Sequence, residues 1–129
     1  MVTYLLDTYA WIEYLIGSSK GEIVRKLFLD KNNDFLTAEC SLSELKGWSI
    51  REKADFARIY STVKANSHIE PIHLDDWLIA AQIKSEMRKN VRDFGLMDSL
   101  LLAKAKSRKC KIVSGDPHFE KLPGVLYLN

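Results

Sequence analysis

The sequence is poor in cysteine, and this shortage limits the class of protein. Its 129 residues contain two cysteines, Cys40 and Cys110, and no C-x-x-C pair. A zinc ribbon or a disulfide-rich secreted scaffold needs more cysteines than this. The simplest interpretation is two reduced core thiols, and a bridge between them stays open. Proline and glycine are also few, three and six, and nothing in the composition is typical of a disordered or repetitive chain.

Long apolar runs and an excess of one charge are absent as well. No apolar run approaches the roughly 20 residues of a membrane-spanning helix. The first residues lack the basic, apolar and small-residue segments of a signal peptide, so we expect a cytoplasmic protein. Lysine and arginine total 19 against 17 aspartates and glutamates, which gives a net charge of +2. This balance permits a nucleic-acid partner without indicating one.

Short apolar runs alternate with amphipathic segments along the chain. The apolar runs predict strands at about 4–6, 34–37, 69–74, 111–114 and 125–128. The amphipathic segments predict helices at about 8–16, 21–30, 41–52, 55–65, 75–89 and 97–109. This alternation favours one α/β domain over residues 1–129, a three-layer α/β/α fold with a mostly parallel sheet of about four to five strands. Pro71 moves the third strand toward an edge or irregular position.

Four carboxylates are expected at one edge of that sheet. Asp7 follows the first strand, and Asp116 follows the fourth. Glu44 lies in the first turn of a helix that the S-x-x-E capping-box pattern at Ser41 begins. Asp98 opens the helix before the fourth strand. Helices run back against the strands, so helix N-termini share an edge with the strand C-termini, where α/β proteins place their functional residues.

Each acid alone is explained as a helix cap or a partner of the helix dipole. Together they repel one another, which raises their pKa values and costs stability unless a cation is bound. Mg²⁺ takes one or two carboxylates directly, and Mn²⁺ suits the same ligands. A metal held in this way activates water against a phosphodiester in many nucleases. The hydroxyls of Thr8 and Ser114 either orient such groups or simply satisfy amides at the strand ends.

The segments that carry these acids resemble the PIN-domain family, and within it the VapC-type toxin ribonucleases. The matching pieces are LLDTYAWIEYL, SLSELKGW, GLMDSLLLAKAKSRKCKIVSGDPHF and the short last strand. They follow the family's order over nearly the whole chain. Ser114 stands where many relatives have threonine, and Met97 precedes Asp98 where a small residue is common.

The resemblance implies a Mg²⁺- or Mn²⁺-dependent endoribonuclease that acts on RNA in the cytoplasm. Asp7, Glu44, Asp98 and Asp116 occupy the family's four acidic positions, so they are the expected catalytic and metal-binding residues. Family members usually form homodimers. A small VapB-type antitoxin holds them inactive, with its C-terminal segment in the groove near the acids.

Two other functions stay open from the sequence. A receiver domain also has an acidic Mg²⁺ pocket, but it needs paired acids after the first strand and a lysine directly before a proline. Here Leu6 and Thr8 flank Asp7, and Leu122 separates Lys121 from Pro123. A PIN-like domain that binds RNA or protein without catalysis is the other alternative. The complete set of four acids argues against it.

Two further features are interpreted as structural. The basic residues from Lys104 to Lys111 are expected on the solvated face and at the C-terminus of a helix. His118 lies close to Asp116 in sequence, and contact with substrate is the lesser of its two interpretations.

Overall fold

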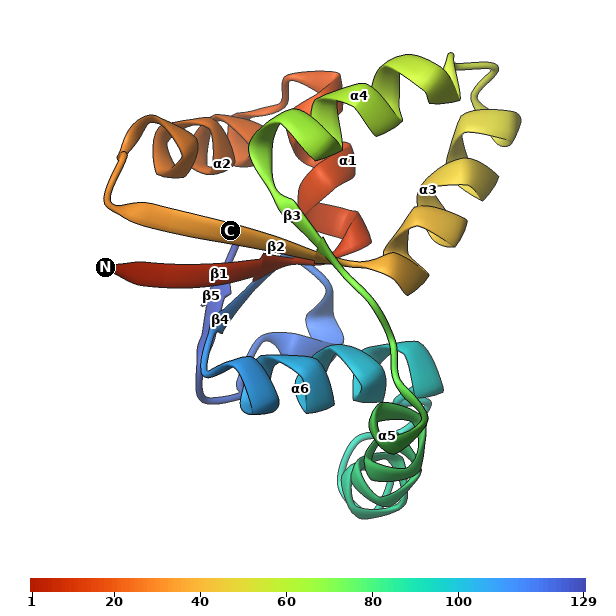
Figure 1. Cartoon of the computed structure of the whole chain (residues 1–129). Coiled ribbons are helices and arrows are strands. Elements are labelled where there is room, and N and C mark those ends of the chain that lie inside the picture. The colour runs from red at the N-terminus through yellow and green to blue at the C-terminus, as the bar shows by residue number, and fades with distance from the viewer.

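Five parallel strands form the centre of the computed structural model, which describes residues 1–129 (Figure 1). Their order across the sheet is β3-β2-β1-β4-β5, and every neighbouring pair is parallel. This confirms the α/β fold with a parallel sheet. The strands are β1 (Val2–Leu6), β2 (Asn33–Ala38), β3 (His68–Glu70), β4 (Lys111–Ser114) and β5 (Val125–Tyr127).

Helices cover both faces of the sheet (Figure 1). Above it in that view lie α1 (Thr8–Ile16), α2 (Ser19–Leu29), α3 (Glu39–Arg51) and α4 (Phe56–Asn66). Below it lie α5 (Leu74–Met87) and α6 (Leu96–Arg108), and a short 3-10 turn, η1 (Pro117–Phe119), follows β4. None of these helices has the length and apolar composition that a membrane crossing needs.

The alternation of side chains in β1 divides the core between the two faces. Tyr4 and Leu6 belong to the cluster under α1–α4, with Trp11 fully buried among them. Leu5 belongs to the cluster under α6, with Phe94 and Phe119. Successive residues of a strand point to opposite faces, so a strand covered on both sides is apolar throughout. That is why the run at 4–6 predicts a buried strand correctly.

The predicted start of α3 is wrong. The helix begins at Glu39 directly after β2, and its N-cap, Ala38, has no side chain that can cap. The Ser41 hydroxyl is buried without a hydrogen-bond partner, so it caps nothing. Glu44 consequently lies in the second turn of the helix, and its carboxylate is free for another contact.

The third strand is shorter than predicted, and its edge position is confirmed. β3 pairs only with β2 and ends at Glu70. Pro71 has no N–H to donate, which prevents the ladder from continuing. The chain then enters α5, where the backbone N–H of His73 donates to the Asp76 carboxylate at 2.8 Å.

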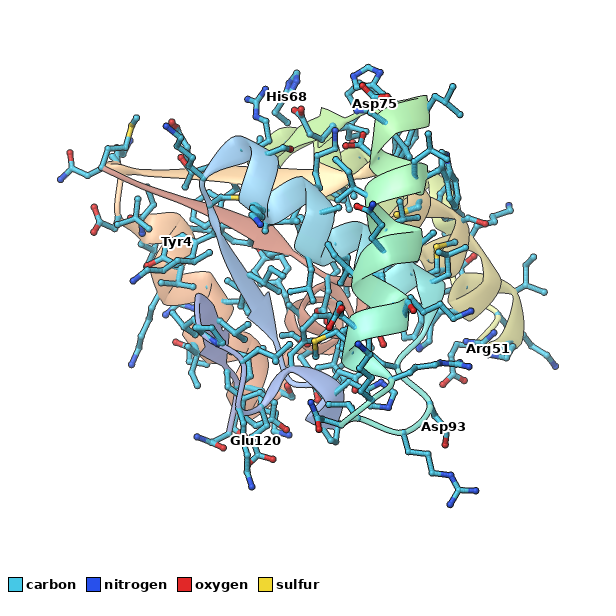
Figure 2. The ribbon with its side chains drawn as sticks, turned by 90° about the horizontal axis from the view of Figure 1, so that it is seen from below. Tyr4, Arg51, His68, Asp75, Asp93 and Glu120 are labelled. Carbon is cyan, nitrogen blue, oxygen red and sulfur yellow. The ribbon has the colours of Figure 1, made fainter.

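The solvated position predicted for Lys104 is also wrong. Its side chain is buried, with its Nζ 2.9 Å from Oδ2 of Asp76. Lys104 lies on the side of α6 that packs against α5, and the contact between these helices encloses the pair. Figure 2 views the molecule from this side, with the exposed Asp75 labelled near the start of α5. The two cysteines are free, as expected.

Candidate metal centre

Asp7 begins the site at the point where β1 ends. Its side chain is only 4% exposed, and its Oδ1 accepts a hydrogen bond from the Ala10 N–H at 2.8 Å, so Asp7 is the N-cap of α1. Burial, together with the smaller effect of the charges of Asp116 and Asp98, raises the pKa of Asp7 to about 7. Hydrogen bonds from Ser114 and Ala10 oppose this rise only in part. Asp7 is therefore a cap that also carries an incompletely compensated charge.

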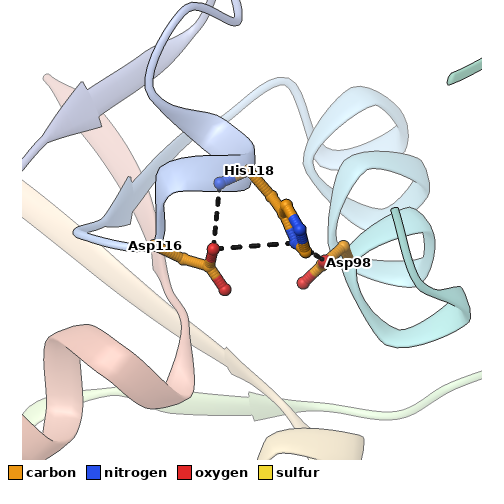
Figure 3. A group of neighbouring side chains, drawn as sticks. All are labelled: Asp98, Asp116 and His118. Carbon is orange, nitrogen blue, oxygen red and sulfur yellow. Dashed lines mark hydrogen bonds and ion pairs between the residues drawn. The ribbon is translucent and has the colours of Figure 1, made fainter. Parts of the chain in front are cut away.

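Asp98 and Asp116 meet at the same edge through a histidine (Figure 3). Asp98 lies in the first turn of α6, and Asp116 caps the η1 turn after β4 by accepting the His118 N–H at 2.9 Å. The His118 ring hydrogen-bonds through Nδ1 with Oδ2 of Asp98 at 3.0 Å. The same Nδ1 is 3.7 Å from Oδ1 of Asp116. One ligand atom from each of the three residues lies within 4.8 Å of the others.

The electrostatics of this group favour a bound cation. Burial raises the pKa of Asp98, and the neighbouring Asp116 raises it too, whereas the hydrogen bond with His118 acts in the opposite direction. Two carboxylates and an imidazole form a donor set that suits a divalent ion. Oxygen ligands are preferred by Mg²⁺ and Mn²⁺, and a nitrogen ligand shifts the preference toward transition metals.

Glu44 reaches the site indirectly. Thr8, the residue after Asp7, donates its hydroxyl to Oε1 of Glu44 at 2.7 Å. This hydrogen bond links α3 to the start of α1. Asp7 and Glu44 themselves lie outside the 4.8 Å group of Asp98, Asp116 and His118.

Ser114 lies between two of the acids. Its side chain is fully buried at the end of β4, and its Oγ accepts the Asp116 N–H at 3.0 Å. The same hydroxyl hydrogen-bonds with Asp7. Ser114 thus fixes the turn that carries Asp116 and supports Asp7 at the same time.

The structure places His118 in the site. From the sequence, a role in the site is the less favoured of its two interpretations. The signal for it lies in the order Asp116-Pro117-His118. A proline at the first position after an N-cap begins a tight helical turn, and that turn brings the residue two positions after the aspartate back beside it. Sequence spacing alone does not reveal that Asp98 lies on the other side of the His118 ring.

Comparison with known proteins confirms the family resemblance through the sequence and the fold through solved structures. The sequence profile of the PIN domain matches residues 4–125. A chain of a toxin–antitoxin complex from Klebsiella pneumoniae superimposes with a TM-score of 0.77 at 16% identity, covering 98% of both chains. A chain of a DNA-bound VapBC from Salmonella typhimurium gives a TM-score of 0.70 at 21% identity, covering 97% of this chain and 96% of that one.

A third structure bears a functional description. VapC20 of Mycobacterium tuberculosis, described as a sarcin–ricin loop cleaving toxin, gives a TM-score of 0.68 at 15% identity and covers 86% of both chains. No curated protein matches the sequence.

Proposed function

The chain belongs to the PIN domain family, and we propose that it is a metal-dependent endoribonuclease of the VapC toxin type that hydrolyses RNA phosphodiester bonds. One observation carries the proposal: Asp7, Asp98 and Asp116 converge at the carboxyl ends of β1 and β4, and no lysine or arginine pairs with them. The description of VapC20 as a sarcin–ricin loop cleaving toxin supports RNA as the substrate class.

The donor set supports a resident Mg²⁺ or Mn²⁺. Asp98 and Asp116, with His118 beside them, would hold the ion directly, and Asp7 and Glu44 would reach it through water or hold a second one. When bound, the ion supplies an activated water and neutralises charge on the leaving oxygen.

The chain's own side chains would orient these groups. Ser114 and the Ala10 N–H hold the buried Asp7 in one conformation, and the Thr8 hydroxyl holds Glu44 toward the same edge. Rotation of either acid away from the site would break these hydrogen bonds. The acids are thus positioned before substrate arrives, which lowers the cost of assembling the transition state.

A protein partner is part of the proposal. Two of the similar structures are toxin–antitoxin complexes, and we infer that a VapB-type antitoxin holds this chain inactive in the cytoplasm and that the chain forms a homodimer. Exposed apolar side chains offer surface for such contacts; among them are Leu74, Trp77 and Leu78 on α5.

Cleavage of labelled RNA by the purified chain tests the activity. The reactions contain Mg²⁺, Mn²⁺ or EDTA, and the substrates present single-stranded and stem-loop segments. We expect cleavage that needs the metal and falls at least about a hundredfold in Asp7→Asn and in Asp98→Asn. Asp75→Asn, an exposed acid outside the site, is the matched control.

Two results would overturn the proposal. Equal cleavage by Asp7→Asn, Asp98→Asn and the parent would indicate a contaminating nuclease and a wrong site. Metal binding by a folded, antitoxin-free chain that cuts none of the RNAs would favour a domain that only binds.

A further inference from the structure

A lysine lies beside the acidic edge with no carboxylate at ion-pair distance, although the charge of Glu13 is near enough to raise its pKa slightly. Lys20, in the first turn of α2, donates from its Nζ to the phenol oxygen of Tyr9 at 3.0 Å. The ammonium also lies 5.3 Å from the centroid of the Tyr9 ring. It forms no ion pair, whereas several other cations do: Arg25 with Glu22, Lys89 with Glu86, Lys104 with Asp76 and Arg108 with Glu70.

Tyr9 connects this lysine to the site. It follows Asp7 and Thr8 in the chain, and its ring lies against Gly115, the residue between Ser114 and Asp116. A Cβ at Gly115 would collide with that ring, so only glycine permits the contact. Lys20 is therefore held one side chain away from the turn that carries Asp116.

Tyr127 holds the other side of this turn. From β5 it donates its hydroxyl to the carbonyl oxygen of Gly115 at 3.0 Å. Its proton is thereby engaged, so Tyr127 acts as a positioning residue rather than as a donor to a ligand.

The Tyr9 hydroxyl is different. It accepts a hydrogen bond from Lys20, and its own proton is donated to no protein group. The hydrogen bond with Tyr9 raises the pKa of Lys20 from an already high ordinary value, so this contact does not cost the amine its charge. The phenol proton and the ammonium protons that do not bond to Tyr9 thus lie together at the rim without a protein acceptor. This is the pattern that an incoming anion needs.

The neighbouring acids explain why such a pair is useful. Clustered carboxylates repel the phosphates of RNA, and a cation at the rim attracts them. A phenol orients the ammonium without cancelling its charge, which an aspartate or glutamate would do.

We propose that Lys20 and Tyr9 form a subsite for a backbone phosphate of RNA next to the phosphodiester that is cut. The inference rests on the proposed ribonuclease function. Lys20 supplies the charge and Tyr9 a hydrogen bond, while Tyr127 and Gly115 keep the subsite aligned with Asp116.

The test measures RNA binding apart from cleavage. All variants are built on Asp98→Asn, which prevents cutting, and the affinity for a labelled single-stranded RNA is followed by fluorescence anisotropy over a range of salt concentrations. Lys20→Ala is expected to weaken binding about tenfold. It should also reduce the slope of log K against log salt by about 0.7, the value for one phosphate contact on a single strand.

Companion variants separate the two donors. Lys20→Arg should keep the salt slope, because it keeps the charge. Tyr9→Phe should weaken binding about threefold with the slope unchanged, because it removes a neutral donor. Lys26→Ala, which removes an exposed lysine from the same helix, should change neither quantity. Thermal melting of each variant checks that it is folded.

The outcomes distinguish this inference from the proposed function. If the parent binds RNA and Lys20→Ala binds it with the same affinity and the same salt slope, the subsite is overturned. The proposed ribonuclease function is not affected by that result. An equal loss of RNA affinity in Lys26→Ala also overturns the subsite, because the effect would then come from the net positive charge of the protein and not from the position of Lys20. Absence of both RNA binding and cleavage in the wild-type chain would overturn the two proposals together.

Discussion

Two buried aspartates of this protein have opposite surroundings. Asp76, between α5 and α6, lies 2.9 Å from the Lys104 ammonium. Burial alone raises its pKa, but the hydrogen bond from His73 and the charge of Lys104 outweigh burial and hold the pKa of Asp76 below its usual range. Asp7, at the end of β1, has only acids and uncharged donors near it, and its pKa is raised to about 7.

The contrast distinguishes a structural aspartate, Asp76, from one that we assign to the functional site, Asp7. At Asp76 the chain supplies its own counter-charge, so the region is complete without a ligand. At Asp7 it supplies hydrogen bonds but no cation, and a partner from outside has to neutralise the site. Burial of a carboxylate therefore says little about its role until the nearest cation has been identified.

Breaking the ion pair between Asp76 and Lys104 should have the largest effect on stability. Asp76→Asn leaves the Lys104 ammonium buried without a counter-charge, which typically costs about 3–5 kcal/mol of unfolding free energy. Urea unfolding measures this loss. The exposed neighbour variant Asp75→Asn should stay within about 0.5 kcal/mol of the parent. A loss in Asp76→Asn no larger than in Asp75→Asn would show that the ion pair does not stabilise the helix contact.

Removing the charge of Asp7, which no cation compensates, should increase the free energy of unfolding, whereas Asp76→Asn decreases it. The folded-state pKa of Asp7, about 7, lies above the ordinary value of 3.8. The folded protein consequently binds this proton more tightly than the unfolded chain does, and stability falls as the pH rises from about 4 to about 7. In EDTA at pH 8, Asp7→Asn should be more stable than the parent by about 2–4 kcal/mol, because asparagine keeps the cap without the charge.

This difference should shrink toward pH 4, and melting curves at several pH values measure it. A gap that is constant with pH would mean that ionisation of Asp7 is not its cause.

Supplying the missing cation should stabilise the site by a smaller amount. An ion at a hundred times its Kd adds about 2.7 kcal/mol. In His118→Ala, the melting shift with Mn²⁺ should decrease more than the shift with Mg²⁺, because imidazole nitrogen suits transition metals better. Calorimetric titration of both ions into both proteins gives the ratio of affinities. An unchanged ratio would place His118 outside the ligand shell.

The smallest effect is expected at the link between α1 and α3. Thr8→Val removes the hydrogen bond to the exposed Glu44, and unfolding free energy should change by no more than about 1 kcal/mol. RNA cleavage should fall about tenfold nonetheless, since Glu44 loses its fixed orientation. Thr8→Ser, which keeps the hydroxyl, is the control and should retain activity.

The sequence predicted the sheet well because strand signals are local. The alternating burial of Tyr4, Leu5 and Leu6 and the break at Pro71 depend only on neighbouring residues. The acids after β1 and β4 followed from the same reasoning, since parallel strands all end at one edge.

The errors concern contacts between distant segments. The S-x-x-E pattern at Ser41 satisfies a local rule, but β2 leads straight into the helix, which already begins at Glu39. The sequence predicts Lys104 in solvent, because no sequence rule shows that α5 brings Asp76 against it. The sequence makes substrate contact the lesser interpretation of His118, because its partner Asp98 is twenty positions away on another element.

The central place of β1 has a consequence for the newly made chain. β1 pairs on one side with β2, which follows it closely, and on the other with β4, which is translated only after four further helices. At synthesis rates of about 5–20 residues per second, roughly 5–20 s separate Asp7 from Asp116 on the ribosome. A half-translated chain thus carries Asp7 and Glu44 without Asp98 and Asp116. The nuclease activity proposed above would therefore arise only near the end of translation, once β4 and Asp116 have been made.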